Sequence, residues 1–381
     1  MTFDAAAFLD SIEFIDKKIP LPLFHNKLRE LGLPLTSSWG RTLGGLQDIA
    51  NSGSAPKSAL DSLMALQVWI GEYLSHYSKA ILVCRIPLAI PGATLALADS
   101  FEKGLLAIHL LSNHPRAFPG LLGKNEVGLY NGRIVLRDVE KDKDFTSFIF
   151  SAVKEYQVRD VIQITQSDGK ALAKLDGYTK VIAIKIAAHE HIDVVRFRTA
   201  GGPSGFSEDG IDLILDVTKP GSTPLNSDEI SSRAKQYTDA LNGAISASGG
   251  AFKFSTSCNF FGAMDNIYRS TSGNICELYF TTTLGGSVKR EKMKKNTTDL
   301  RTETWHAGGQ SAISSAPVPD SIDIYRLGVS WKIAGDADEP ILIIPGSYRS
   351  LTSRVVDHAI VLGCTGPKSF QFAFSQLMKY C

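Results

Sequence analysis

The sequence lacks any cysteine pair with the spacing of a zinc ribbon or a disulfide framework. Its five cysteines lie far apart and no two of them form a C-x-x-C motif; they are Cys84, Cys258, Cys276, Cys364 and Cys381. Clustered cysteines are typical of small metal-stabilised or disulfide-rich folds. We therefore expect reduced thiols, as in a cytosolic protein.

Long hydrophobic runs are also absent. No apolar stretch approaches the roughly 18 residues that a membrane helix needs. The first residues, MTFDAAAFLDSIEFIDKK, interrupt their apolar run with acids and carry no basic leader, which argues against a signal peptide. These absences predict a cytoplasmic protein without membrane contact.

The chain has no excess of either charge. Its 40 Lys and Arg residues balance 39 Asp and Glu residues, which gives a net charge of +1. A strongly basic chain would favour nucleic acid by its overall charge, and this chain does not. Any contact with phosphate must therefore come from a local cluster of basic residues.

The chain does contain enough apolar material for a large core, since 44% of its 381 residues are hydrophobic. Residues 1–80 are predicted to form a helical N-terminal region. Within it, one helix face is predicted from residues that recur at spacings of three and four in the stretch SALDSLMALQVWIGEYLSHY. These residues are Leu60, Leu63, Gln67, Ile70, Leu74 and Tyr77. From about residue 81 strands alternate with helices, which predicts an α+β fold.

The remaining chain divides into a mixed α/β core, residues 81–283, and a C-terminal α+β region, residues 284–381, which we expect to pack on the core. The core is predicted to have two helices, 144–156 and 227–246, the second capped by Ser227. Its strands are predicted at 158–165, 180–198 (continuous or broken in two), 211–218 and 276–283.

The segment GGPSGFSEDGIDLILDVTKPGS, residues 201–222, carries the first candidate site. In its strand, Asp212, Asp216 and Thr218 lie on one face. The two acids are roughly 13 Å apart along the strand, so sharing an ion requires a bulge or a neighbouring strand. If residues 192–199 pair with 211–219 as a hairpin, Asp193 approaches Asp216. Such carboxylates suit Mg²⁺, and a polar turn with solvated acids is the alternative.

The stretch SEDGIDLIL resembles the D-G-G-I-D strand entry of PD-(D/E)XK nucleases of the methylated-DNA restriction type, and the element order resembles their αβββαβ core. ELYFTTTLGG resembles the last core strand of abortive-infection phage-resistance proteins with a related fold. The resemblance implies a Mg²⁺-dependent phosphodiesterase in phage defence, with Asp212 or Asp193 as first acid and Asp216 as second. The expected lysine is replaced by Thr218, and Lys219 comes one residue late.

That missing lysine keeps a second interpretation open, a non-catalytic binding or assembly protein with a degenerate nuclease-like fold. In the nuclease interpretation the catalytic residues are Asp212, Asp216 and Lys219, and the metal ligands are Asp193, Asp212 and Asp216. A basic residue from 289–295 is an alternative to Lys219 for stabilising charge on the phosphate.

Two further patterns carry candidate chemistry. His189 and His191 lie on one strand face and suit two ligands of one Zn²⁺, with His306 or Asp212 as candidate third ligands. Ordinary hydrogen-bonded histidines are the alternative. The run GGSVKREKMKKNTTDLR predicts nucleic acid as the partner, because phosphate contact needs clustered cations. Its candidate contact residues are Lys289, Arg290, Lys292, Lys294 and Lys295, and a solvated basic face is the alternative.

Overall fold

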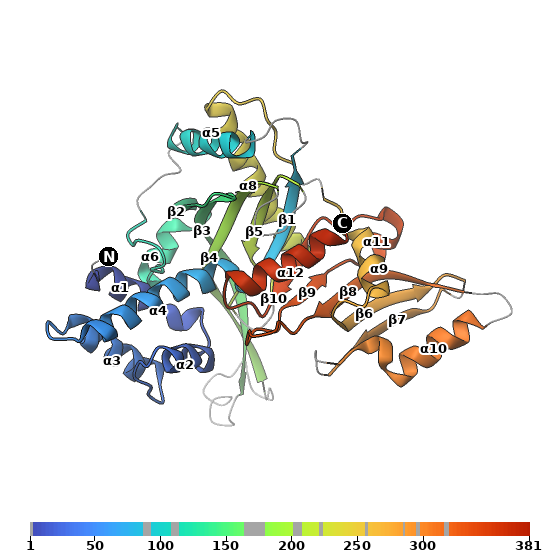
Figure 1. Cartoon of the computed structure of the whole chain (residues 1–381), viewed down its shortest axis with the longest axis horizontal. Coiled ribbons are helices and arrows are strands. Elements are labelled where there is room, and N and C mark those ends of the chain that lie inside the picture. The colour runs from blue at the N-terminus through green and yellow to red at the C-terminus, as the bar shows by residue number, and fades with distance from the viewer. Residues whose placement is uncertain are drawn as a thin grey trace, which may run out of the picture.

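The computed structural model describes residues 3–86, 93–107, 114–163, 180–200, 208–220, 224–255, 258–284, 286–294, 298–315 and 320–381. These residues form an α+β fold, as predicted, built on one large sheet (Figure 1). The strands are β1 (Lys79–Arg85), β2 (Ile134–Lys141), β3 (Phe145–Gln163), β4 (Lys180–Arg198), β5 (Gly210–Asp216), β6 (Asn274–Thr282), β7 (Val288–Lys292), β8 (Ile322–Ser330), β9 (Ile341–Ile344) and β10 (Ala359–Leu362).

The strand order across the described sheet is β2-β3-β4-β5-β1-β10-β9-β8-β6-β7. All pairs between these strands are antiparallel, so the sheet differs from the mixed sheet expected of the core. The C-terminal strands β8, β9 and β10 lie between β1 and β6 of the core. The region 284–381 therefore contributes to the same sheet instead of only packing on it.

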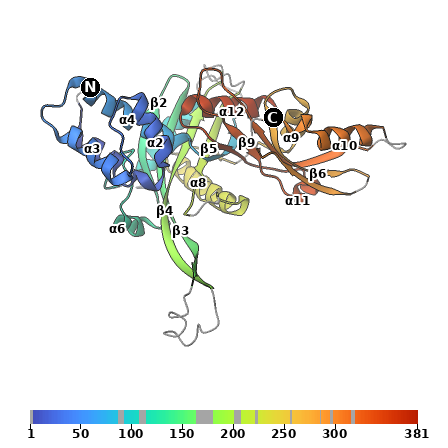
Figure 2. The same cartoon turned by 90° about the horizontal axis from the view of Figure 1, so that it is seen from below.

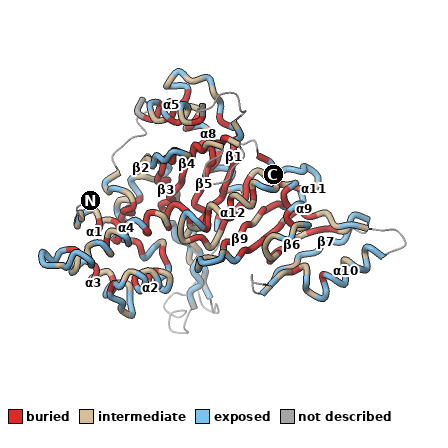
Figure 3. Tube along the Cα trace, viewed as in Figure 1, coloured by how far each residue is buried: buried red, intermediate tan, exposed pale blue. Residues whose placement is uncertain are grey.

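Helices cover both faces of the sheet. One face packs against the predicted N-terminal helices α1 (Ala5–Ile12), α2 (Leu21–Glu30), α3 (Trp39–Asn51) and α4 (Lys57–His76), together with α9 (Phe261–Arg269) and α12 (Pro367–Lys379). The stripe on α4 is buried at Leu63, Ile70 and Leu74, as the spacing predicted. The centre of the sheet is buried along its strands (Figure 3).

The opposite face packs against α5 (Ala93–Ala107) and α8 (Ser227–Ala247). The two helices approach closely at Gly104, where a Cβ atom would lie 1.8 Å from the carbonyl oxygen of Ala244. The N-cap residue of α8 is Asn226, one residue before the predicted Ser227. The Asn226 side chain accepts a hydrogen bond from the backbone amide of Glu229, and the Glu229 carboxylate accepts one from the backbone amide of Asn226.

The stretch 144–156, predicted as a helix, is instead a strand from Phe145 onward and forms the first part of β3. Alternate residues of this stretch enter opposite cores, with Phe148 and Phe150 on one side and Ile149 on the other. The strand pairs with β2, the strand just before it, and with β4, which is distant in sequence for this part of β3, so its conformation depends on pairing outside the segment itself. Residues 180–198 are one unbroken strand.

The outer halves of β3 and β4 continue as a two-stranded ribbon that projects from the body (Figure 2). Its residues include exposed Ile182, Ile184 and Ile186. The remaining α-helices are α6 (Lys124–Val127), α10 (Thr304–Ser314) and α11 (Tyr348–Ser353). No helix within the described ranges is long and apolar enough to cross a membrane.

Candidate functional site

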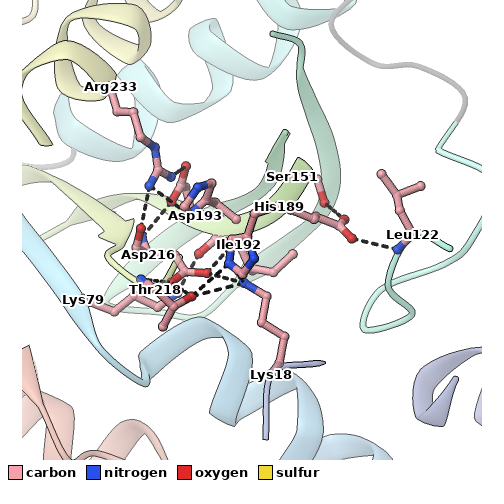
Figure 4. A network of polar contacts seen from close by, with 12 residues as sticks. Lys18, Lys79, Leu122, Ser151, His189, Ile192, Asp193, Asp216, Thr218 and Arg233 are labelled. Atoms are coloured by element: carbon pink, nitrogen blue, oxygen red, sulfur yellow. Dashed lines mark hydrogen bonds and ion pairs between the residues drawn. The ribbon is translucent and has the colours of Figure 1, made fainter. Parts of the chain in front are cut away.

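A buried cluster of charged and imidazole side chains lies where β5 ends and β4 continues beyond it (Figure 4). Five elements contribute to it, because the N-terminal region, three strands and α8 meet at this point. We call it the Asp216 cluster; it comprises Lys18, Lys79, His189, His191, Asp193, Asp216, Thr218 and Arg233.

The ammonium group of Lys18 lies between three acceptors. Its Nζ is 2.8 Å from His189 Nε2, 2.9 Å from Asp216 Oδ2 and 3.2 Å from Thr218 Oγ1. The Lys18 and Asp216 side chains are only 6% and 5% exposed. A cation from the N-terminal region is therefore enclosed by acceptor atoms of the sheet and of the segment that follows β5.

The carboxylate of Asp216 is fully hydrogen-bonded. Oδ1 accepts from the amide and the hydroxyl of Thr218, and Oδ2 accepts from Lys18 and the Ile192 amide. Burial raises the pKa of a carboxyl group, but the charges of Lys18 and Lys79 outweigh it and hold the pKa of Asp216 well below its usual value. Asp216 is therefore ionised throughout the physiological range.

Asp193 faces the other side of the sheet and joins Asp216 through the backbone. Its Oδ1 accepts the Asp216 amide at 2.7 Å, and its Oδ2 forms a buried ion pair with Arg233 of α8. Arg233 also donates to the Asp216 carbonyl oxygen. The predicted approach of Asp193 to Asp216 across the β4–β5 hairpin is thus confirmed.

Lys79, the first residue of β1, supplies the second buried ammonium group. Its Nζ donates to the Ile192 carbonyl oxygen at 2.6 Å. Burial lowers the pKa of Lys79 to about 8, although Asp216 and Asp193 favour its charged form. The cluster therefore places two lysines and one arginine around two carboxylates.

The two histidines are neutral in this setting. Burial, followed by the charge of Lys18, lowers the pKa of His189 to about 3, and burial with Arg233 lowers the pKa of His191 well below its usual value. Because Lys18 donates to His189 Nε2, the proton of this ring is on Nδ1. Arg233 donates to His191 Nδ1, so His191 Nε2 donates to the hydroxyl of Tyr156.

His189, His191 and Asp216 also form a group that could bind a metal ion. One ligand atom from each lies within 4.8 Å of the other two. Nitrogen and oxygen ligands of one tetrahedral zinc ion lie about 3.4 Å apart, so the three side chains would have to move closer together. Lys18 would have to move from Asp216 and His189, and His191 would have to release a partner.

The acids of the predicted metal site do not form such a group within the described residues. Asp212 is fully buried and ion-paired with Arg198 Nε at 2.9 Å. Burial raises the pKa of Asp212, and Arg198 and Arg196 oppose that rise. Lys219, the predicted catalytic lysine, pairs instead with Glu229 of α8 at 2.9 Å.

The predicted basic run lies on the edge strand β7, and its residues point to different sides. Arg290 and Lys292 share a face with Tyr279 and Glu277, whereas Lys289 is opposite Phe280 on the face that enters the core. Lys294 follows the strand and is exposed. Lys295 lies outside the described residues.

The face that carries Arg290 also carries a row of tyrosines. The ring centroids of Tyr279 and Tyr325 are 6.1 Å apart, and those of Tyr325 and Tyr348 are 6.2 Å apart. The guanidinium groups of Arg290 and Arg326 each lie 5.4 Å from the centroid of Tyr279. We call this surface the tyrosine–arginine face; it comprises Tyr279, Arg290, Lys292, Tyr325, Arg326 and Tyr348.

Most partners in the Asp216 cluster and on the tyrosine–arginine face are not evident from the sequence. Lys18, Lys79 and Arg233 lie in three elements remote from the β4–β5 hairpin, and no local pattern connects them. The sequence predicts Asp216 in a carboxylate site, whereas the structure also brings it to the histidine pair. The tyrosines are only weakly indicated by the sequence, since Tyr279 lies in a predicted strand next to the basic run.

Comparisons of the chain with protein-family models, with curated proteins and with solved structures give no match.

Proposed function

We propose that the protein binds single-stranded nucleic acid through the tyrosine–arginine face. The observation that carries the proposal is a line of three residues across neighbouring strands. Arg290 of β7, Tyr279 of β6 and Arg326 of β8 are paired in register, so an aromatic ring lies between two guanidinium groups. Planar cations and aromatic rings are the groups on which unpaired bases stack.

The charge of this face supports the proposal. The face carries three cations and one buried carboxylate, that of Glu277, which pairs with Lys292 and Arg326. Arg290 is exposed and forms no ion pair with any residue in the described part of the chain. The local excess of positive charge supplies the phosphate contact that the net charge of the chain does not.

Exposure and shape also favour a single strand. Tyr348 of α11 is 60% exposed and Tyr279 is partly exposed, whereas Tyr325, which contacts both rings, is buried. Exposed rings on a sheet accommodate splayed bases, as in β-sheet modules that bind unpaired strands. Bases stacked within a duplex are not accessible to such rings.

The test is fluorescence anisotropy with a labelled single strand and the matching duplex, over a range of salt concentrations. Wild type is expected to prefer the single strand. Tyr348→Ala should weaken binding by roughly 5- to 150-fold, the range for loss of one stacked base. Trp305→Ala is the matched control, because Trp305 is 87% exposed but belongs to α10, on the other side of β7. No binding at low salt would refute the proposal.

A second candidate is the predicted metal-dependent phosphodiesterase, now at His189, His191 and Asp216. The observation in its favour is that a cation, the Lys18 ammonium, already lies among two of these ligand groups. The nitrogen-rich ligand set suits Zn²⁺ better than the predicted Mg²⁺, which prefers oxygen. Two large cavities open among the described residues, and neither is lined by a residue of the Asp216 cluster.

Zinc binding measured by equilibrium dialysis tests this second candidate. Lys18→Met should bind zinc more tightly than wild type, and adding His189→Ala should abolish that gain. Lys17→Met is the control, because Lys17 is the exposed neighbour. If Lys18→Met binds no zinc, the metal site is refuted. The phage-defence context remains a prediction from the resemblance.

A further inference from the structure

A cavity of about 850 Å³ lies between α4, the β2–β3 hairpin and the start of α12. Helix α4 contributes Gln67, Val68, Gly71, Glu72 and Ser75 to its lining. Its size is within the range of small-molecule sites. None of its lining residues belongs to the Asp216 cluster or to the tyrosine–arginine face.

Six carboxylates line this cavity, and none of them forms an ion pair with a described residue; they are Asp4, Glu72, Asp138, Glu140, Asp142 and Asp144. The sequence RDVEKDKD explains four of them, because its acids recur at every second position. A bulge between Leu136 and Asp138 aligns these acids with the cavity side. Lys141, between two of the acids, turns away to Glu102 of α5.

The acids on opposite walls influence each other. Burial raises the pKa of Glu140, and the charges of Asp138 and Glu72 raise it further, with Arg196 opposing. Burial likewise raises the pKa of Glu72. Two cations, Arg196 and Lys368, also line the cavity, but Arg196 is buried and already bonded to Ser147 and Gln371.

One polar atom at the cavity provides independent evidence for a ligand. Ser75 lines the cavity and is 5% exposed, and its hydroxyl has no hydrogen-bond partner in the described protein. Buried polar groups are nearly always satisfied, so an unpaired hydroxyl at a cavity wall indicates a missing partner.

The remaining wall of the cavity is apolar, which favours an organic cation over a metal ion. Met64, Val68, Phe118, Pro119 and Phe145 line it, and Val68 is 63% exposed. The acids do not bring three ligand atoms together as a metal site requires, within the part of the chain that the structure describes. Alternate acids on a strand lie about 6 to 7 Å apart, a spacing comparable to that of successive amines in an aliphatic polyamine.

We infer that this cavity binds a linear polyamine, with its ammonium groups on the carboxylates of β2 and α4 and its methylene chain on the apolar wall. The Ser75 hydroxyl would accept one of the N–H groups. The inference does not depend on the proposed nucleic-acid binding.

Isothermal titration calorimetry of the full chain with spermidine tests the inference. Wild type should bind spermidine at about one per chain, and Glu72→Gln and Glu140→Gln should each weaken binding by about tenfold. Both substitutions keep the shape and remove one charge. Glu155→Gln is the matched control, because Glu155 is exposed on the projecting ribbon.

Two further measurements separate a built site from general attraction to acids. Val68→Lys places an ammonium group at the exposed wall and should abolish binding while the circular dichroism spectrum stays unchanged. Mg²⁺ at equal charge should not displace spermidine. Absence of spermidine binding, displacement by Mg²⁺, or equal effects of Glu140→Gln and Glu155→Gln would each overturn the inference.

Discussion

The Asp216 cluster and the tyrosine–arginine face are built from similar groups and have opposite settings. Both place lysine or arginine beside a carboxylate and an aromatic ring on neighbouring strands. In the Asp216 cluster the charges are enclosed, and Asp193 and Asp216 are each held by several donors. On the tyrosine–arginine face Arg290 is exposed without an ion pair to a described residue, and the one carboxylate, Glu277, pairs with Lys292 and Arg326.

The difference indicates which charges maintain the fold and which are available to a ligand. A buried ion pair loses its hydration, and removal of one partner leaves an uncompensated charge inside the protein. An exposed cation retains water and contributes little to folding. We therefore expect substitutions in the Asp216 cluster to reduce stability, and substitutions on the tyrosine–arginine face to reduce binding.

The largest effect is expected for Asp216→Asn. Loss of this carboxylate leaves the ammonium groups of Lys18 and Lys79 buried without their main counter-charge. The free energy of unfolding should fall by about 3 kcal/mol. Urea denaturation at pH 7 measures it, with Asp160→Asn as control because the Asp160–Lys185 pair is exposed on the ribbon. Equal losses of unfolding free energy in Asp216→Asn and Asp160→Asn would contradict the claim that buried charges maintain the fold and exposed charges do not.

A smaller effect concerns the pH dependence of stability and the buried histidine His76 of α4. Burial, then the charges of Arg196 and Lys79, lower the pKa of His76 to about 3, although its Nδ1–H donates to the Glu72 carbonyl oxygen. The unfolded chain takes up this proton near pH 6.5, so stability falls as the pH drops from about 6.5 toward 3.

His76→Gln should reduce the slope of unfolding free energy against pH by up to about 1.4 kcal/mol per pH unit between pH 6 and 4.5. Urea denaturation at several pH values measures the slope for both proteins. His25→Gln serves as control, because His25 is only partly buried. A slope unchanged from wild type in His76→Gln would show that His76 is protonated in the folded protein.

The smallest effect on stability is expected for Arg290→Ala. The side chain is exposed and contacts the Tyr279 ring without an ion pair to a described residue. The free energy of unfolding should change by less than about 0.5 kcal/mol. Thermal and urea denaturation measure it. A destabilisation comparable to that of Asp216→Asn would mean that the tyrosine–arginine face is structural.

The sequence was sufficient where structure depends on local pattern. Strand β5 and helix α8 were predicted because alternation and helix-start signals occur within a few residues. The approach of Asp193 to Asp216 followed from a hairpin between neighbouring strands. The helix predicted at 144–156 was wrong, because Phe145, Phe148, Ile149 and Ala152 recur at helical spacing, and the stretch becomes a strand only through pairing with β2 and β4.

The candidate sites depended more on tertiary structure. Lys18 and Lys79 reach Asp216 only after the N-terminal region and β1 pack on the sheet, so nothing near position 216 indicated them. The basic run was visible as a cluster, but its division into two faces required the register of β7 on β6. A strand sequence fixes which residues share a face and leaves open which face remains exposed.

Binding of a labelled single strand by Arg290→Ala and Lys289→Ala, titrated over salt, tests the central claim most directly. The two residues are adjacent on β7, carry the same charge and point to opposite faces. Arg290→Ala should weaken binding and reduce the slope of log K against log salt by about 0.7, the value for one phosphate of a single strand that is no longer neutralised. Lys289→Ala should leave the slope at the wild-type value. Equal slopes for both variants, or a larger change in Lys289→Ala, would contradict the assignment of the tyrosine–arginine face as the nucleic-acid interface.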